Sequence, residues 1–286
     1  MTRNKTMIVA GMHRSGTSLI TQWLQRCGLH VGDNLLGADT GNDNGHFEDL
    51  DFLDSHKAIL KSQRLSDNGF TAVPLKPLSC SDVDRLKDII AYKNSIHVQW
   101  GWKDPRTCLF LETYHSLLPD AFYFVVLRDY QSVIASLVYR MYSQKEAKYA
   151  GRKGIGGFLW RQFLKKRKME TLRKKYTQRF LQIWINYNQA VLNHINRLPE
   201  EQYMVADYTV LVENDRMVFE QLVHQYGFNL QYFDFSTIYK PKQLNKPYEA
   251  EAYIRDKSLL IKAVYIQESL QRKNIVHAPM KALAVL

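Results

Sequence analysis

The stretch Met7–Leu24, MIVAGMHRSGTSLITQWL, decides the fold of this chain. Residues 7–10 are apolar and partly β-branched, which is typical of a short buried strand. Apolar residues then recur at the spacing of a helix that begins near Thr17. The order of strand, glycine-bearing loop and helix predicts an anion cradle over Gly11–Ser18, because the loop N–H groups and the helix N-terminus point at one spot.

The spacing of the loop glycines, Gly11 and Gly16, is that of a P-loop. A nucleoside triphosphatase needs a lysine after the second glycine, but Thr17 stands there. Arg14 adds a fixed positive charge, and Thr17 and Ser18 add hydroxyl donors. The loop therefore predicts a phosphate or sulfate site. The alternative is an ordinary strand-to-helix turn in which the two glycines supply backbone freedom.

The chain has 286 residues, of which 45% are hydrophobic, enough for one large α/β domain. Its three cysteines are far apart and have no metal-ligand spacing, which argues against a disulfide framework and a zinc site. No signal peptide or apolar run of membrane-spanning length is evident. These features predict a protein of the reducing cytoplasm.

The net charge of +11 is concentrated in residues 140–176. This segment holds thirteen Lys or Arg residues and two Glu, which accounts for the whole excess. Such a segment could face an acidic glycan, an anionic membrane surface or nucleic acid. The alternative is a solvated helical face. Because the segment lacks regular aromatic interleaving, we expect no specific nucleic acid as its partner.

Apolar strands alternate with helical patterns along the first half of the chain. Residues 96–102 and 122–127 read as buried strands. A helix is expected over 82–92, and Val133, Ile134 and Leu137 mark another. The pattern predicts an α/β fold with a P-loop-like central parallel sheet flanked by helices, and a mainly helical C-terminal half. We expect a single domain over residues 1–286, with a basic, mainly helical addition at about 140–197.

Basic residues follow the three predicted strands, at Arg14, Lys103 and Arg128. The carboxyl ends of parallel strands meet at one edge of the sheet, where ligands bind in doubly wound folds. Each residue alone could instead pair with a neighbouring Asp. Together with the phosphate-type loop they favour a polyanionic ligand.

Two motifs resemble those of the sulfotransferase superfamily, whose members use 3′-phosphoadenosine 5′-phosphosulfate (PAPS). GMHRSGTS resembles the 5′-phosphosulfate loop of its bacterial-type branch, and YFVVLRDYQSVIASL resembles its 3′-phosphate motif, with Arg128 and Ser136 matching in type and spacing. Tyr208 resembles, more weakly, a tyrosine that contacts the adenine. The resemblance implies these cofactor-binding residues: Arg14, Ser15, Gly16, Thr17, Ser18, Arg128, Ser136 and Tyr208.

The same resemblance implies the catalytic residues. Lys103 looks like a lysine that several branches keep near the transferred sulfuryl group, and Arg14 would share that charge. The histidine base of the cytosolic branch has no counterpart after Lys103. Glu48 is the first choice of base, because glutamate bases follow the first helix in other branches. His46, Asp49 and Asp104 remain alternatives, and Glu48 could simply favour the dipole of a helix N-terminus.

The implied reaction is sulfuryl transfer from PAPS to a hydroxyl acceptor, releasing 3′-phosphoadenosine 5′-phosphate (PAP), with no metal required. The acceptor would be a carbohydrate, a lipid-linked glycan or a small molecule, drawn in by residues 140–176 if it is acidic or membrane-associated. Two other classes remain open. One is a P-loop kinase for nucleosides or small molecules, and the other is a protein that binds nucleic acid or an anionic surface.

Overall fold

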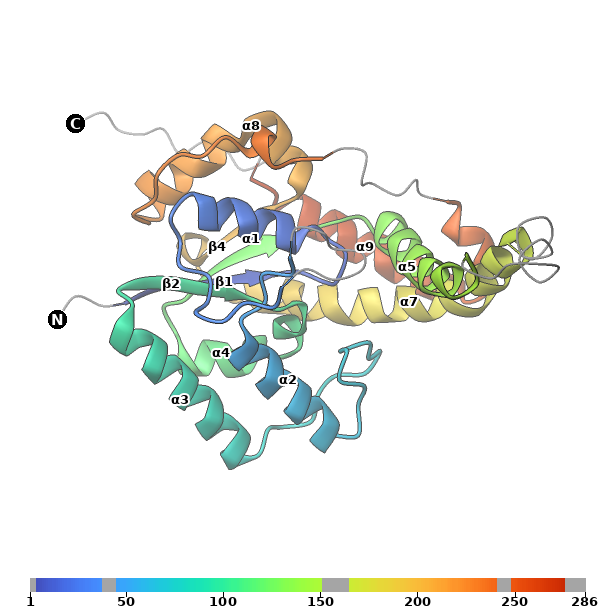
Figure 1. Ribbon diagram of the computed structural model, residues 1–286, viewed down its shortest axis with the longest axis horizontal. Coiled ribbons are helices and arrows are strands. Elements are labelled where there is room, and N and C mark those ends of the chain that lie inside the picture. Colours follow the sequence, from blue (N-terminus) through green and yellow to red (C-terminus); the bar gives the residue numbers. More distant parts are fainter. Residues whose placement is uncertain (1–3, 38–44, 151–164, 241–247, 276–286) are drawn as a thin grey trace.

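The computed structural model of the protein describes residues 4–37, 45–150, 165–240 and 248–275. Its centre is a parallel four-stranded sheet in the order β2-β1-β3-β4 (Figure 1). The strands are β1 (Lys5–Ala10), β2 (Gln99–Lys103), β3 (Phe122–Val126) and β4 (Tyr203–Ala206). The predicted α/β fold with a central parallel sheet is confirmed.

Helices join and cover the strands. The longer ones in the described residues are α1 (Thr17–Arg26), α2 (Leu50–Ser62), α3 (Cys80–Ile96), α4 (Leu111–Leu117), α5 (Tyr130–Ala150), α7 (Lys165–Ile195), α8 (Tyr208–Glu220) and α9 (Lys257–Gln271). Short turns of 3₁₀ or π helix lie at Pro105–Leu109, Glu200–Gln202, Gln221–Gln225, Phe235–Thr237 and Ala250–Tyr253. None of the described helices is both long enough and apolar enough to cross a membrane.

The two faces of the sheet bury different side chains of the same strands, as the two-residue repeat of a strand requires. In β1, Met7 and Val9 pack with α1 and α8, whereas Ile8 and Ala10 pack with α2, α5, α7 and α9. Figure 1 shows α1 and α8 on one side of the sheet and α2, α3 and α4 on the other. Because both faces are covered, the carboxyl edge of the sheet is left to carry a site.

Element boundaries differ by a few residues from those expected. The helix expected over 82–92 extends over Cys80–Ile96, and therefore β2 begins only at Gln99 and ends with Lys103 itself. β2 lies very close to β1, since a Cβ on Gly101 would be 2.3 Å from the carbonyl oxygen of Met7. Lys103 is the last residue of this strand and therefore lies at the carboxyl edge of the sheet.

The C-terminal half is mainly helical in the residues described, as predicted. α7 carries the apolar stripe that includes Trp184 and Tyr187 into the core beside α5 and α9 (Figure 1). The basic segment 140–176 covers the end of α5 and the start of α7, and its central part, residues 151–164, lies outside the described residues. The assignment of one domain with a helical addition stays a prediction.

Candidate active site

The loop between β1 and α1 has the backbone of an anion cradle. Gly16 has φ +97° and Arg14 has φ +69°, a left-handed conformation that costs a non-glycine residue free energy and is concentrated at functional sites. No side chain caps α1, and its first turn holds no acidic residue. The N–H groups at the start of this helix are thus free of a capping oxygen and suited to a bound anion.

One cluster joins this loop to β3 and α5. The Arg14 Nε donates to Ser136 Oγ at 2.9 Å, and the Arg128 Nη1 donates to the carbonyl oxygen of Arg14 at 2.8 Å. The Nε of Arg128 is buried and has no hydrogen-bond partner in the described residues. A guanidinium with an unused buried donor fits an oxyanion that accepts a charge-assisted hydrogen bond.

Tyr208, at the start of α8, borders the same cluster. The Arg128 guanidinium carbon lies 5.7 Å from the centre of its ring, within the range of a cation–π contact. The ring stacks with that of Tyr239 at 6.2 Å between centroids, and a Cβ on Gly16 would lie 3.7 Å from it. An aromatic face therefore lies beside the loop, which suits a planar base.

A second cluster joins the loop to β2 and to the segment before α2. The Lys103 Nζ contacts Glu48 Oε1 at 3.1 Å and donates to Ser18 Oγ at 3.3 Å. Arg106 Nη1 lies 3.7 Å from the other Glu48 oxygen. Burial lowers the pKa of Lys103, an effect that the Glu48 carboxylate opposes. Glu48 is thus a buried carboxylate held between two cations, next to the start of α1.

Behind this cluster lies a buried chain of hydrogen bonds. The Asp104 Oδ1 accepts from Arg106 Nη1 at 2.7 Å, and its Oδ2 lies 2.6 Å from His56 Nδ1. The other nitrogen of His56 lies 2.6 Å from the Tyr114 hydroxyl. Burial alone would raise the pKa of Asp104, but the Arg106 charge and the His56 hydrogen bond outweigh it and hold that pKa well below its usual value. The chain orients Arg106, and through it Glu48.

The four residues considered as the base differ in their surroundings. Asp49 caps α2 through Asp51 N and pairs with Lys93 at 2.8 Å. Asp104 is fully buried and has both oxygens engaged. His46 lies beside Ser18, whose hydroxyl donates to its carbonyl oxygen. The carboxylate that directly contacts the strand-end lysine is that of Glu48.

His13 is a loop residue that the sequence interpretation passed over. Burial, with the charges of Arg106 and Lys103 adding to it, lowers the pKa of His13 to about 3, so its ring is neutral at pH 7. Its Nε2 is buried without a hydrogen-bond partner in the described residues. The ring packs edge-on against Phe70 at 5.1 Å between centroids. The motif places His13 in the loop. The residues that surround its ring come from distant segments, so the local sequence does not indicate that the ring is buried.

Arg106 and His56 were also missed. Arg106 is only three residues after Lys103, yet nothing in the sequence indicates that its side chain contacts Glu48. His56 lies on the buried face of α2, where a histidine is indistinguishable by periodicity from any other core residue. Both roles depend on contacts between residues far apart in the sequence.

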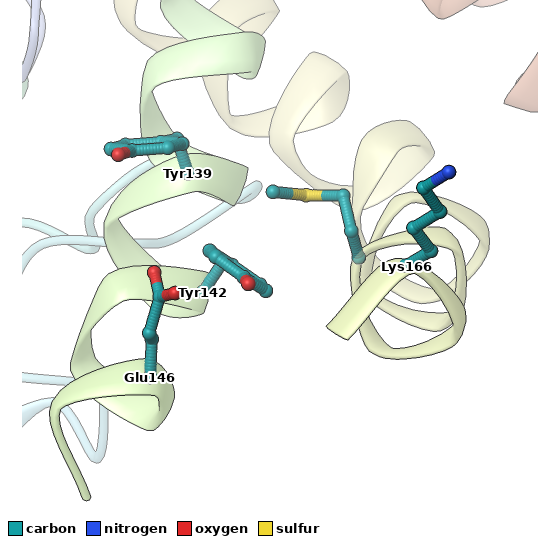
Figure 2. Close-up of a pocket in the computed structure, with 5 residues that line it drawn as sticks. Tyr139, Tyr142, Glu146 and Lys166 are labelled. Atoms are coloured by element: carbon teal, nitrogen blue, oxygen red, sulfur yellow. The ribbon is translucent and has the colours of Figure 1, made fainter. Parts of the chain in front are cut away.

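A hollow of about 410 Å³ lies between α5 and α7, further along α5 than Ser136. It is lined by Tyr139, Tyr142, Glu146, Lys166 and Met169. Figure 2 shows Tyr139, Tyr142 and Glu146 rising from one helix and Lys166 from the other. None of the predicted donor-binding residues is among those that line it.

The sequence matches no known family model and no curated protein. Solved structures, however, are similar to the fold. Sulfotransferase STF9 from Mycobacterium avium gives a TM-score of 0.53 at 15% identity, with 93% of this chain and 76% of that chain covered. The sulfotransferase domain of the Synechococcus PCC 7002 olefin synthase gives 0.50 at 16% identity, with 95% and 96% covered. At such identities the likeness shows the fold, which is that of sulfotransferases, as the sequence resemblance implied.

Proposed function

We propose that this protein is a sulfotransferase that moves the sulfuryl group of PAPS to a hydroxyl acceptor at the carboxyl edge of its sheet. The observation that carries the proposal is that the loop before α1 contacts two clusters at once. Arg14 reaches Ser136 and Arg128, and Ser18 reaches Lys103, which holds Glu48. The two motifs that resemble those of PAPS enzymes therefore meet in space.

The donor-binding roles are divided between the clusters. Arg128 and Ser136 would hold the 3′-phosphate, using the unused Nε of Arg128. The loop residues 14–18 and the start of α1 would hold the 5′-phosphosulfate, and Tyr208 would face the adenine. When bound, the nucleotide would supply an activated sulfuryl group and a stable leaving group, and we expect protein donors to hold it without a metal.

The second cluster would perform the transfer. Sulfuryl transfer, like phosphoryl transfer, needs in-line positioning and neutralisation of charge on the leaving oxygen. Lys103 and Arg14 would supply that charge. As the bond from the acceptor oxygen to sulfur forms, the bond from sulfur to PAP breaks, and the acceptor proton passes to a base. We assign this base to Glu48, because it contacts Lys103 directly while Asp49 and Asp104 are engaged elsewhere.

The expected acceptor and place of action are based on the basic segment and on the free cysteines. In the basic segment 140–176, Lys166 and Arg167 are exposed, so we expect the segment to draw in an acidic or membrane-associated hydroxyl acceptor. The cysteines at positions 27, 80 and 108 are free, which supports a reducing cytoplasm as the place of action.

The direct test is transfer of labelled sulfate from PAPS to a panel of carbohydrates, glycolipids and small hydroxyl compounds. We expect transfer to at least one acceptor class and release of PAP in equal amount, with EDTA present. Labelled ATP with Mg²⁺ over the same panel is the comparison. Phosphoryl transfer from ATP without any sulfuryl transfer from PAPS would overturn the proposal in favour of a kinase.

A further inference from the structure

Two histidines and one carboxylate meet near the Glu48 segment, and the proposed transfer reaction uses none of them. They are His30, Asp33 and His97, and one nitrogen or oxygen from each lies within 4.8 Å of the others. The Oδ1 of Asp33 is 3.1 Å from His30 Nε2 and 2.9 Å from His97 Nε2. The two imidazole rings stack at 3.7 Å between centroids, so their Nε2 atoms face the same oxygen.

This spacing is close to that of ligands around a small tetrahedral cation. Zinc bonds of about 2.0 Å to nitrogen and oxygen place ligand atoms roughly 3.3 Å apart. Only a small outward shift of the three side chains would be needed. The His30 Nε2 atom is buried and lies 3.1 Å from Asp33 Oδ1 without forming a well-aligned hydrogen bond, which leaves this nitrogen available as a ligand. The carboxylate is exposed enough to leave a position open to water.

Backbone hydrogen bonds fix two of the three ligand residues, His97 and His30, whereas Asp33 lies in a bend. His97 follows directly after α3 and donates its N–H to the Lys93 carbonyl. His30 forms a bridge to Trp100 of β2, and its carbonyl oxygen accepts from Gly101 N at 2.8 Å. Sites built on such elements are better preorganised than sites on loops.

A second set of contacts fixes the carboxylate and sets the charge. The other oxygen of Asp33 accepts from Lys93 Nζ at 2.6 Å, and the same ammonium contacts Asp49 at 2.8 Å and Asp51 at 2.9 Å. Three carboxylates and one ammonium together carry a net charge of −2. Outer partners of this kind orient ligands in metal sites, and the excess charge suits a divalent cation.

We propose that His30, Asp33 and His97 form a binding site for a divalent transition metal, with Zn²⁺ as the best match to two imidazoles and a carboxylate. The site is separate from the donor-binding residues. The chain that follows Asp33 pairs with the Glu48 segment, since Leu36 N donates to the Glu48 carbonyl at 2.8 Å. A bound metal would therefore stabilise the chain around Asp33, and with it the chain at Leu36 that pairs with Glu48.

The test is calorimetric titration of the untagged full chain, first treated with EDTA and then dialysed, with Zn²⁺. We expect one equivalent to bind and to raise the melting temperature, because a ligand of the folded state stabilises it. The variants His30→Ala and His97→Ala should each bind about tenfold or more weakly. His224→Ala, which removes an exposed histidine elsewhere, is the matched control and should bind like the unchanged protein.

Equal affinity in all four proteins, or no binding to the unchanged chain, would overturn the site. Co²⁺ provides a readout on the unchanged protein in case a variant folds poorly. Visible absorption bands of tetrahedral Co²⁺ are expected at one equivalent, and a spectrum like that of the hydrated ion would contradict the proposal. None of these readouts depends on sulfuryl transfer, so the metal site and the proposed function fail independently.

Discussion

At the scale of single residues, the proposed transfer reaction depends on a carboxylate held between two cations. Glu48 is buried, yet its contacts with Lys103 at 3.1 Å and Arg106 at 3.7 Å keep it beside the loop that would carry the sulfuryl group. Phe47 has φ +54°, a conformation that costs a non-glycine residue free energy. The backbone before α2 is thus shaped to present Glu48.

Glu48→Gln keeps the shape of the side chain and removes its basicity. We expect kcat to fall by about 10²–10⁴, while PAP affinity stays nearly the same, as for loss of general-base help alone. Pre-steady-state assays and a PAP titration of the same variant measure the two quantities. If Glu48→Gln stays active while His46→Ala is inactive, His46 is the base, and the assignment of the donor site survives.

Asp104 gives a prediction about stability and pH. Its pKa is depressed in the folded protein, so the free energy it adds to folding is present above the ordinary pKa of about 4 and declines as the pH falls further. Asp104→Asn leaves Arg106 and His56 without their charged partner, and should cost roughly 3 kcal/mol at pH 7.

Urea unfolding of the unchanged chain and of Asp104→Asn between pH 7 and pH 3 measures this effect. The difference in unfolding free energy should be constant down to about pH 5 and shrink below pH 4. A difference that is independent of pH over that range would show that the Asp104 charge does not stabilise the fold.

At the scale of elements, β2 places Lys103 at the carboxyl edge of the sheet, and Gly101 lets the strand pair with β1 where a side chain would clash. A Cβ on Gly101 would be 2.3 Å from the Met7 carbonyl oxygen, which is backbone and has little room to move. Gly101→Ala should therefore push β2 from β1 and cost about 1–3 kcal/mol or more, as overpacking does.

The matched control is Gly37→Ala, since a Cβ at that glycine meets no atom of the described residues within 4 Å. Thermal unfolding of both variants measures the effect, and only Gly101→Ala should melt at a clearly lower temperature. Equal melting temperatures would show that the strand contact is not tight enough to position Lys103.

The elements themselves were largely predictable from the sequence. Short apolar runs predict the strands β1 and β3. The helical spacing of apolar residues after the glycine-bearing loop predicts the start of α1. Boundaries were less accurate where a helix continued through polar residues, as α3 does to Ile96. The residues that surround Glu48 were not predictable, because Arg106 and His56 come from other elements and carry no periodic signal.

At the scale of the whole molecule, the sheet brings together what the sequence separates by more than a hundred residues. Arg14 and Arg128 meet as predicted from the rule that parallel strands share a carboxyl edge, and Ser136, which the family resemblance pairs with Arg128, contacts Arg14. The cluster of His30, Asp33 and His97 could not be read in the same way. Metal ligands of this kind have no fixed sequence spacing. The spacing of the three cysteines carries no information about a site made of histidine and aspartate.

The most direct test of the central claim is calorimetric titration of the chain with PAP in EDTA. We predict binding of one PAP per chain without a metal, weakened about ten- to a hundredfold by Arg128→Ala, since that change removes a charge-assisted contact of roughly 1.5–3 kcal/mol. Gly37→Ala should bind PAP like the unchanged chain. Undiminished PAP affinity in Arg128→Ala, or binding of ATP with Mg²⁺ in place of PAP, would contradict the account.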